Sequence, residues 1–279
     1  MRVKLWGTRG SVSRAGAGTV TYGGDTSAVE VTTDQAVIVL DAGSGIVPYG
    51  DTLLGEVDRI DILLTHLHMD HIQGLGFFRP LFDPSTEVHI WGPISTTMDL
   101  ATRLRRYLSP PLFPVRLRDL DVTLHDVIPG TVEIGGLRVT ADLVIHPGAT
   151  VGYRVEAPGG QSLCYLPDHE PALGVRSFPE SPEWTSGYAL AEGVDLLLHD
   201  TQYTAEEYAT RSGWGHSTLE HAMAFAGLTG VRRLVTFHHD PEHTDAFLDA
   251  RLAAARSTAG PGRLFELTAG RPGATFDFR

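Results

Sequence analysis

The feature that most constrains this chain is a dense group of histidines and an aspartate directly after an apolar segment. Residues Ile60–Thr65 have the pattern of a buried strand, and the next six residues are His66-Leu67-His68-Met69-Asp70-His71. On extended backbone, side chains two positions apart point the same way, so the first two imidazoles face one point. Imidazole nitrogen and carboxylate oxygen are ligands that zinc, manganese and iron accept without any thiolate. The sequence therefore predicts a metal-binding loop at the end of a strand.

Short apolar runs separated by Gly, Pro and Asp predict a chain rich in strands. The expected strands are Ala28–Thr32, Ala36–Asp41, Arg59–Thr65, Glu87–Trp91, Arg138–Ile145, Gly152–Glu156, Ser162–Leu166, Asp195–His199 and Arg233–Phe237. Helices are expected at Thr96–Leu108, Ser217–Leu228 and Asp245–Ala255. The second of these helices would begin with a capping box of Ser217 and Glu220, and Gly230 lies just beyond its end. Strands flanked by helices in both halves favour an α/β fold with sheets sandwiched between helices.

The His-x-His-x-Asp-His run resembles the first motif of the metallo-β-lactamase fold superfamily of metallohydrolases. Further segments resemble the ribonuclease Z-like branch and follow in the expected order: Leu5–Ser11, Tyr22–Ser27, Leu40–Gly45, Val144–Pro147, Tyr165–Asp168, Gly215–Thr218 and Val235–His238. The resemblance covers nearly the whole chain. It implies an αββα sandwich, in which two packed mixed β-sheets are flanked by helices, and a dinuclear metal site.

The resemblance also implies which residues bind the two ions. The ligands would be His66, His68 and His146 for one ion, and Asp70, His71 and His238 for the other, with Asp168 bridging them. His239 directly follows His238, and one sequence does not formally decide between them, although the strand register and the family spacing favour His238. Two divalent ions, zinc or else manganese or iron, could share a hydroxide and polarise a phosphoryl oxygen. Asp41, at the end of a buried strand, is a candidate acceptor for the second nitrogen of a ligand histidine.

Two residues outside the ligand set are expected to take part in catalysis, together with Asp70. The resemblance implies that His216 approaches the scissile phosphate and that Asp200 takes the place of the acid that orients it. Such an imidazole could stabilise charge in the transition state or protonate a leaving alkoxide. The alternative is a loop histidine that packs against Trp214.

Composition excludes several classes of protein. The chain of 279 residues has Lys+Arg 22 against Asp+Glu 34, a formal charge of -12 that argues against broad nucleic-acid binding. Its one cysteine, Cys164, excludes a disulfide framework and lies on an expected core strand. No apolar run approaches the roughly 18 residues of a membrane span, and Met1–Gly7 is too short and polar for a signal peptide. We therefore expect a cytoplasmic protein without a membrane partner.

These features predict a dinuclear metal-dependent hydrolase. A small phosphodiester, such as a cyclic nucleotide or a nucleotide-derived metabolite, is the leading substrate class. Three alternatives stay open: ribonuclease Z-like RNA processing, thioester hydrolysis of the glyoxalase II kind, and a non-catalytic metal-bearing scaffold for a biosynthetic pathway. The acidic charge and the lack of a Gly/Pro/Lys-rich arm argue against RNA, and Gly215–Thr218 gives no support to thioester hydrolysis.

We expect one domain over residues 1–279, with a Pro- and Arg-containing excursion at about 78–128. The excursion could form a lid or a contact in a homodimer, or simply a solvated helix face; its arginines are Arg103, Arg105, Arg106, Arg116 and Arg118. The glycine-rich Gly7–Gly24 segment, with Arg9 and Ser11, could form an anion-binding nest or a simple hairpin turn.

Overall fold

Two seven-stranded β-sheets pack face to face in the computed structural model of the chain, which describes residues 1–171, 173, 178–179, 181–258 and 264–278. In spatial order the first sheet contains β14 (Thr275–Asp277), β1 (Arg2–Gly7), β2 (Ala28–Thr32), β3 (Val37–Leu40), β4 (Arg59–Leu63), β5 (Glu87–Pro93) and β6 (Val122–Val127). The second contains β13 (Glu266–Ala269), β12 (Arg233–Phe237), β11 (Leu196–Asp200), β10 (Ser162–Leu166), β9 (Val151–Glu156), β8 (Leu137–Leu143) and β7 (Gly130–Ile134). Each sheet is mixed, with four strands running parallel from β3 to β6 and from β10 to β13.

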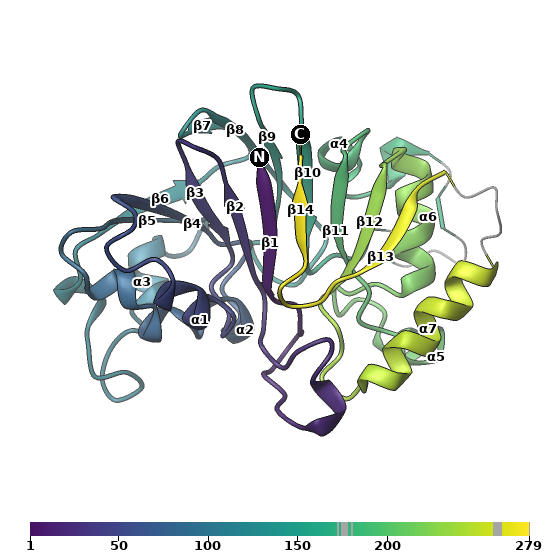
Figure 1. Ribbon diagram of the computed structural model, residues 1–279, viewed down its shortest axis with the longest axis horizontal. Helices are drawn as coiled ribbons and strands as arrows, with labels where there is room; N and C mark the ends of the chain where they lie inside the picture. The colour runs from purple at the N-terminus through teal and green to yellow at the C-terminus, as the bar shows by residue number, and fades with distance from the viewer. Residues whose placement is uncertain (172, 174–177, 180, 259–263, 279) are drawn as a thin grey trace.

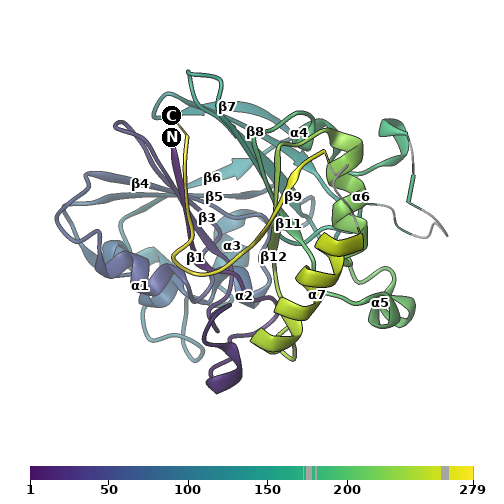
Figure 2. The same ribbon diagram turned by 45° about the vertical axis from the view of Figure 1, so that its right-hand side comes forward.

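Helices cover the outer faces of the two sheets, so the expected αββα sandwich is confirmed (Figure 1). On the side of the first sheet lie α1 (Ile46–Asp51), α2 (Met69–Ile72) and α3 (Leu100–Leu104). On the side of the second lie α4 (Tyr188–Ala191), α5 (Ala205–Arg211), α6 (Leu219–Thr229) and α7 (Asp245–Thr258). The turned view brings α7 forward and shows the two chain ends side by side (Figure 2). None of the helices in the described ranges has the length and apolar character of a membrane span.

Alternation along the strands divides the buried side chains between the layers. On β3, Ile38 and Leu40 belong to the core between the sheets, whereas Val39 packs on the helical side. On β10, Tyr165 faces the other sheet and Cys164 packs against the outer helices. The prediction that Cys164 is a core residue is therefore confirmed, since its side chain is fully buried.

Parallel strands place their following loops at one edge of the molecule, as in other α/β sheets. The chain leaves β4 toward His66, β10 toward Asp168 and β12 toward His238. Because the register pairs Leu63 with Leu40, and His199 with both Leu166 and Thr236, these strand ends are level within each sheet. The two sheets thus deliver polar residues from both sides to a common edge.

Several expected boundaries were wrong for local reasons. The helix expected at Thr96–Leu108 is only α3; it starts later because the Asp99 side chain caps it by accepting the Thr102 backbone N–H, and it ends at Leu104. The helix expected to begin at Ser217 is capped instead by Thr218, while the Ser217 hydroxyl donates to the His169 carbonyl. Within the expected 78–128 excursion, β5 and β6 are strands of the sheet, and residues 78–86, 94–121 and 128 lie outside it.

Candidate metal centre

Two groups of histidine and aspartate side chains that share one residue meet at this edge, and a third group, Asp200, His216 and His238, adjoins them. Within each group the potential ligand atoms all lie within 4.8 Å of one another, and Asp168 belongs to both groups; the members are His66, His68, His146 and Asp168 in the first, and Asp70, His71, Asp168 and His238 in the second. The structure therefore brings together all seven residues expected to be metal ligands. All of them except His68 are buried.

Hydrogen bonds fix which nitrogen of each imidazole in the first group faces inward. The Nδ1 atom of His146 lies 2.9 Å from the Gly215 carbonyl oxygen, so it carries the proton of the neutral ring, and the unprotonated Nε2 lies 3.2 Å from His68 Nδ1. The Nδ1 atom of His66 lies 3.1 Å from the Thr65 hydroxyl, which donates to Asp41. Both histidines therefore present an unprotonated Nε2 toward Asp168, at 3.8 Å for His66 and 3.7 Å for His146.

Asp41 organises the second group, as its position at a strand end predicted. Its Oδ2 atom accepts from His71 Nδ1 at 2.8 Å and from the Tyr165 hydroxyl at 3.0 Å, and its Oδ1 accepts the Thr65 backbone N–H at 2.7 Å. The His71 Nε2 atom then lies 2.9 Å from Asp168 Oδ1. A carboxylate behind a ligand histidine orients the ring and raises its basicity as a ligand.

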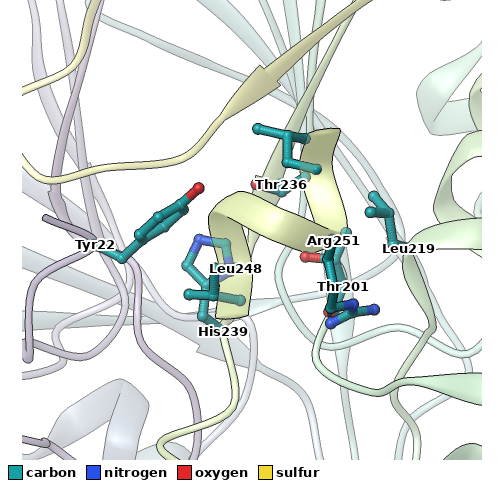
Figure 3. Close-up of a pocket in the computed structure, with 8 residues that line it drawn as sticks. Tyr22, Thr201, Leu219, Thr236, His239, Leu248 and Arg251 are labelled. Atoms are coloured by element: carbon teal, nitrogen blue, oxygen red, sulfur yellow. Dashed lines mark hydrogen bonds between the residues drawn. The ribbon is translucent and has the colours of Figure 1, made fainter. Parts of the chain in front are cut away.

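The structure distinguishes His238 from His239. The Nε2 atom of His238 lies 3.2 Å from both Asp70 Oδ2 and Asp168 Oδ1, and its Nδ1 donates to Gln202 Oε1 at 2.8 Å. His239 instead donates from Nε2 to the Gly270 carbonyl and meets the ring of Tyr22 edge-on in a separate small pocket (Figure 3). His238 is therefore the member of the cluster.

His216 stands beside the clusters and is paired with Asp200. Its Nδ1 atom lies 2.7 Å from Asp200 Oδ2 and 3.9 Å from Asp168 Oδ2, and its ring stacks on that of His238 at 5.1 Å. Burial alone would lower the pKa of His216, but the adjacent Asp200 carboxylate outweighs it and raises the pKa to about 9. The Asp200 carboxylate thus favours the protonated form of this imidazole, which can donate a proton.

Charge and burial in the clusters suit a divalent cation. Burial lowers the pKa of His66 and of His146, which favours the neutral form that binds metal. Although burial raises the pKa of Asp168, the neighbouring His238 and His71 hold it well below its usual range. The Nε2 atom of His66 is buried without a hydrogen-bond partner in the described part of the chain. Buried polar atoms without a hydrogen-bond partner are rare unless a ligand completes them, and an unprotonated imidazole nitrogen is a metal ligand, so these residues fit a metal.

Comparison with known proteins identifies the family. Residues 36–239 match the family of β-lactamase superfamily domains. The chain belongs to this superfamily. Ribonuclease Z of Deinococcus radiodurans is 28% identical, covering 83% of this chain and 91% of its own. The metallo-β-lactamase fold protein YhfI of Bacillus subtilis has a TM-score of 0.70 at 18% identity over 99% of both chains. A diphosphatase of the PhnP family has a TM-score of 0.69 at 19% identity, over 100% of this chain and 98% of that one.

Membership of the metallo-β-lactamase superfamily and its His/Asp clusters make this chain a metal-dependent hydrolase. The predicted resemblance and the predicted fold are both confirmed. The clusters suit a dinuclear site.

The Gly7–Gly24 segment supports the centre through its backbone. The Arg9 guanidinium is buried and donates to the carbonyls of Gly23, Asp240 and His243, so it braces the loop. The Ser11 backbone N–H donates to Asp70 Oδ2 at 2.7 Å. Gly10 lies so close to His238 that a Cβ there would be 2.4 Å from Nδ1.

Sequence reasoning missed the residues that hold the ligands in place. Gln202, Thr65 and Tyr165 each bond to a cluster residue or to Asp41. Their positions within three residues of Asp200, His66 and Asp168 were the available signals, but none belongs to a recognised ligand pattern. Glu170, two residues after Asp168, was also missed.

Proposed function

We propose that this chain is a dinuclear metal-dependent phosphodiesterase that acts on a small anionic phosphodiester. The observation that carries the proposal is the His216–Asp200 pair at 2.7 Å, because it adds a proton donor beside a cluster suited to two cations. Hydrolysis of a phosphodiester releases an alkoxide, which benefits from a proton donor at the leaving oxygen. The names of the similar proteins, a ribonuclease Z and a diphosphatase, support phosphoryl chemistry.

In this proposal His66, His68 and His146 hold one ion, Asp70, His71 and His238 hold the second, and Asp168 contacts both. When bound, two divalent ions, zinc in the first instance, would supply the positive charge that polarises a phosphoryl oxygen and activates water. The proposed ligands are five imidazoles and two carboxylates, without a thiolate. Nitrogen and oxygen ligands of this kind suit zinc, manganese or iron.

The chain's own groups then bind the substrate and move a proton. His216 is held through Nδ1 by Asp200, so its Nε2 is the nitrogen that donates to the leaving oxygen. Asp200 is fixed in turn by the Gln202 backbone N–H at 2.9 Å, which keeps the imidazole in one orientation. The pair supplies a cation and a proton at one point.

A groove beside the metal loop supports an anionic substrate of limited size. Leu67, Met69 and Ile72, which flank His68 and His71, form one wall; the other residues that line it are Met98, Arg103, Arg106, Tyr107 and Leu112. Arg106 contacts Met98 Sδ and forms no salt bridge with any described carboxylate. Arg106 can therefore attract a small anion that enters the groove beside the proposed metal centre. A long polyanion would also meet the rest of a chain whose formal charge is -12, so the small anion is favoured.

The proposal treats residues 1–279 as one domain, because loops from both sheets supply the proposed ligands. We further propose a reducing cytoplasmic setting, since a single buried cysteine needs no oxidising compartment. A homodimer is compatible with the exposed apolar residues of the excursion, such as Ile94 and Leu112.

A substrate panel tests the proposal. Purified protein is analysed for bound metal and then offered bis-p-nitrophenyl phosphate, cyclic nucleotides, a precursor transfer RNA, a lactoyl thioester and a chromogenic cephalosporin. We expect two metal ions per chain and turnover of small phosphodiesters that is lost in His68→Ala. Turnover of the thioester alone, cleavage of the RNA alone, or two bound ions without any turnover would each overturn the proposal in favour of the corresponding alternative.

A further inference from the structure

Glu170 is a buried carboxylate that has no place in the proposed chemistry, yet it binds an unusual number of donors. It is only 1% exposed. Its Oε2 atom accepts the backbone N–H groups of Gly213 and Gly215, at 3.0 and 2.9 Å, and its Oε1 accepts the Tyr208 hydroxyl at 2.6 Å. A buried charge is tolerated only when donors surround it in this way. The carboxylate therefore determines the path of the loop that contains the two glycines.

The loop fastened by Glu170 carries groups from both parts of the proposed centre. The Gly215 carbonyl accepts the Nδ1 proton of His146, and the next residue is His216. The backbone N–H of Glu170 also donates to the carbonyl of Ile145, directly before His146. The Glu170 side chain thus fixes the loop whose Gly215 carbonyl bonds to His146, and the Glu170 backbone bonds to Ile145, the residue before His146.

The two glycines give the loop a shape that needs such an anchor. Gly213 and Gly215 have φ values of 88° and 85°, in the left-handed region that glycine adopts readily. The Gly215 carbonyl accepts the Nδ1 proton of His146 only because the backbone of Gly215 passes close to the ring. A side chain would not fit there, since a Cβ on Gly215 would lie 2.4 Å from His146 Nδ1. Glycine backbone is also costly to order, and the carboxylate offsets that cost with two charge-assisted hydrogen bonds.

We infer that Glu170 is a positioning residue that couples the two halves of the proposed centre, because it fastens one loop that sets both the tautomer of the ligand His146 and the location of the proton donor His216. The inference rests on the proposed function for the roles of these two histidines. Its physical basis, the anchoring of Gly213 and Gly215 by a carboxylate, is independent of any substrate.

Glu170→Gln tests the inference in the full-length protein. The amide keeps only one acceptor oxygen, and its NH2 group must face either the Gly213 and Gly215 N–H groups or the Tyr208 hydroxyl and the Gly213 N–H, so in either orientation part of the acceptor set of the loop is lost. We expect amide hydrogen exchange at Gly213 and Gly215 to accelerate about tenfold or more, as for a locally opened loop. Zinc affinity, measured by competition with a chromophoric chelator, should fall about 10- to 100-fold at one of two sites, the effect expected when the partner of a ligand histidine is disturbed.

Kinetics add a readout that a general loss of structure would not give. If the phosphodiesterase proposal is right, Glu170→Gln should slow substrates with a poor alkoxide leaving group more than bis-p-nitrophenyl phosphate, since p-nitrophenolate needs little protonation. Equal slowing of both substrates would contradict the coupling to His216. The hydrogen-exchange and zinc measurements need no turnover. They therefore still test the positioning role of Glu170 if the phosphodiesterase proposal fails.

Glu207→Gln is the matched control, because this nearby carboxylate bonds to Thr204 and His243 and not to the loop. It should leave exchange at Gly213 and Gly215 unchanged. If Glu170→Gln does not fold, Tyr208→Phe removes one donor from the same carboxylate and should by itself accelerate exchange at Gly213. Unchanged exchange and unchanged zinc affinity in a folded Glu170→Gln protein would overturn the inference.

Discussion

The Oδ2 atom of Asp41 lies 2.8 Å from Nδ1 of His71, and this bond leaves the other ring nitrogen of His71 directed at the Asp70 and Asp168 carboxylates of the proposed metal centre. Asp41 is fully buried and has a positive φ of 60°, which a non-glycine residue adopts only where surrounding contacts hold it. A single carboxylate thus joins the end of β3 to a proposed ligand. Its replacement should disturb the metal before it disturbs the fold.

We therefore expect Asp41→Asn to lower zinc affinity about 10- to 100-fold and to cost about 1–3 kcal/mol of unfolding free energy, because an amide NH2 replaces one acceptor among several donors. Chelator competition and urea unfolding measure the two effects. Asp142→Asn, at the exposed end of β8, is the control and should change neither. A folded Asp41→Asn protein with wild-type zinc affinity would show that His71 needs no partner.

The His216–Asp200 pair predicts a dependence on the leaving group. His216→Asn should reduce kcat about 10²- to 10⁴-fold for a phosphodiester with an alkyl leaving group, the range of a lost general acid. The loss with bis-p-nitrophenyl phosphate should be clearly smaller. Metal content should remain at the wild-type value, since His216 is outside the proposed ligand set. Equal losses on both substrates would assign His216 to binding and not to proton transfer.

Strand positions and strand-end residues were predictable because both follow from local chemistry. Ser162–Leu166 and Arg233–Phe237 match β10 and β12 residue for residue, since apolar runs bounded by polar turns have few alternatives. The grouping of His146, Asp168 and His238 came from the resemblance and not from spacing, because these residues are far apart in the chain. Local pattern alone identifies only the His66–His71 loop.

The supporting residues were not predictable, because their partners come from loops that meet only in the folded chain. Gln202 bonds to His238 and Ser11, and Glu170 bonds to Gly213 and Gly215. A polar residue in a loop gives no sign of such partners. The helix expected at Thr96–Leu108 failed for a different reason: periodicity was satisfied, but the Asp99 cap set a later start.

The contact between Gly10 and His238 predicts selective loss of one ion. A methyl group at position 10 would lie 2.4 Å from His238 Nδ1 and must displace the ring. Gly10→Ala should therefore reduce bound zinc from about two ions to about one per chain, because the first group of ligands is not touched. Metal analysis of the purified protein measures this directly.

Gly227→Ala provides a matched control for that substitution. Gly227 lies within α6, and a Cβ there meets nothing within 4 Å. We expect two bound ions and a gain of about 0.5–1 kcal/mol in stability from the better helix former. Two ions in Gly10→Ala as well would contradict the placement of His238 in the second site.

His199 predicts how stability changes with pH. It is fully buried on β11, where its Nδ1 donates to the Asp200 carbonyl and its Nε2 accepts from His169. Burial lowers its pKa to about 4, against about 6.5 in an unfolded chain. Between about pH 6.5 and pH 4, His199 therefore binds a proton in the unfolded chain but stays neutral in the folded protein. The stabilising contribution is complete above about pH 6.5 and is lost progressively as the pH falls toward 4.

The size of this loss follows from the separation of the two pKa values and is about 3 kcal/mol. His199→Gln removes the titrating group but keeps a side chain that can donate and accept. Urea unfolding at pH 7.5 and pH 4.5 should show a drop in stability smaller by up to about 3 kcal/mol in the variant than in the wild type. Comparing the two drops cancels the histidines that do not contact His199, because they titrate alike in both proteins. Equal drops would mean that His199 gains its proton in the folded state as easily as in the unfolded chain, and that its burial between β10 and β12 imposes no electrostatic cost.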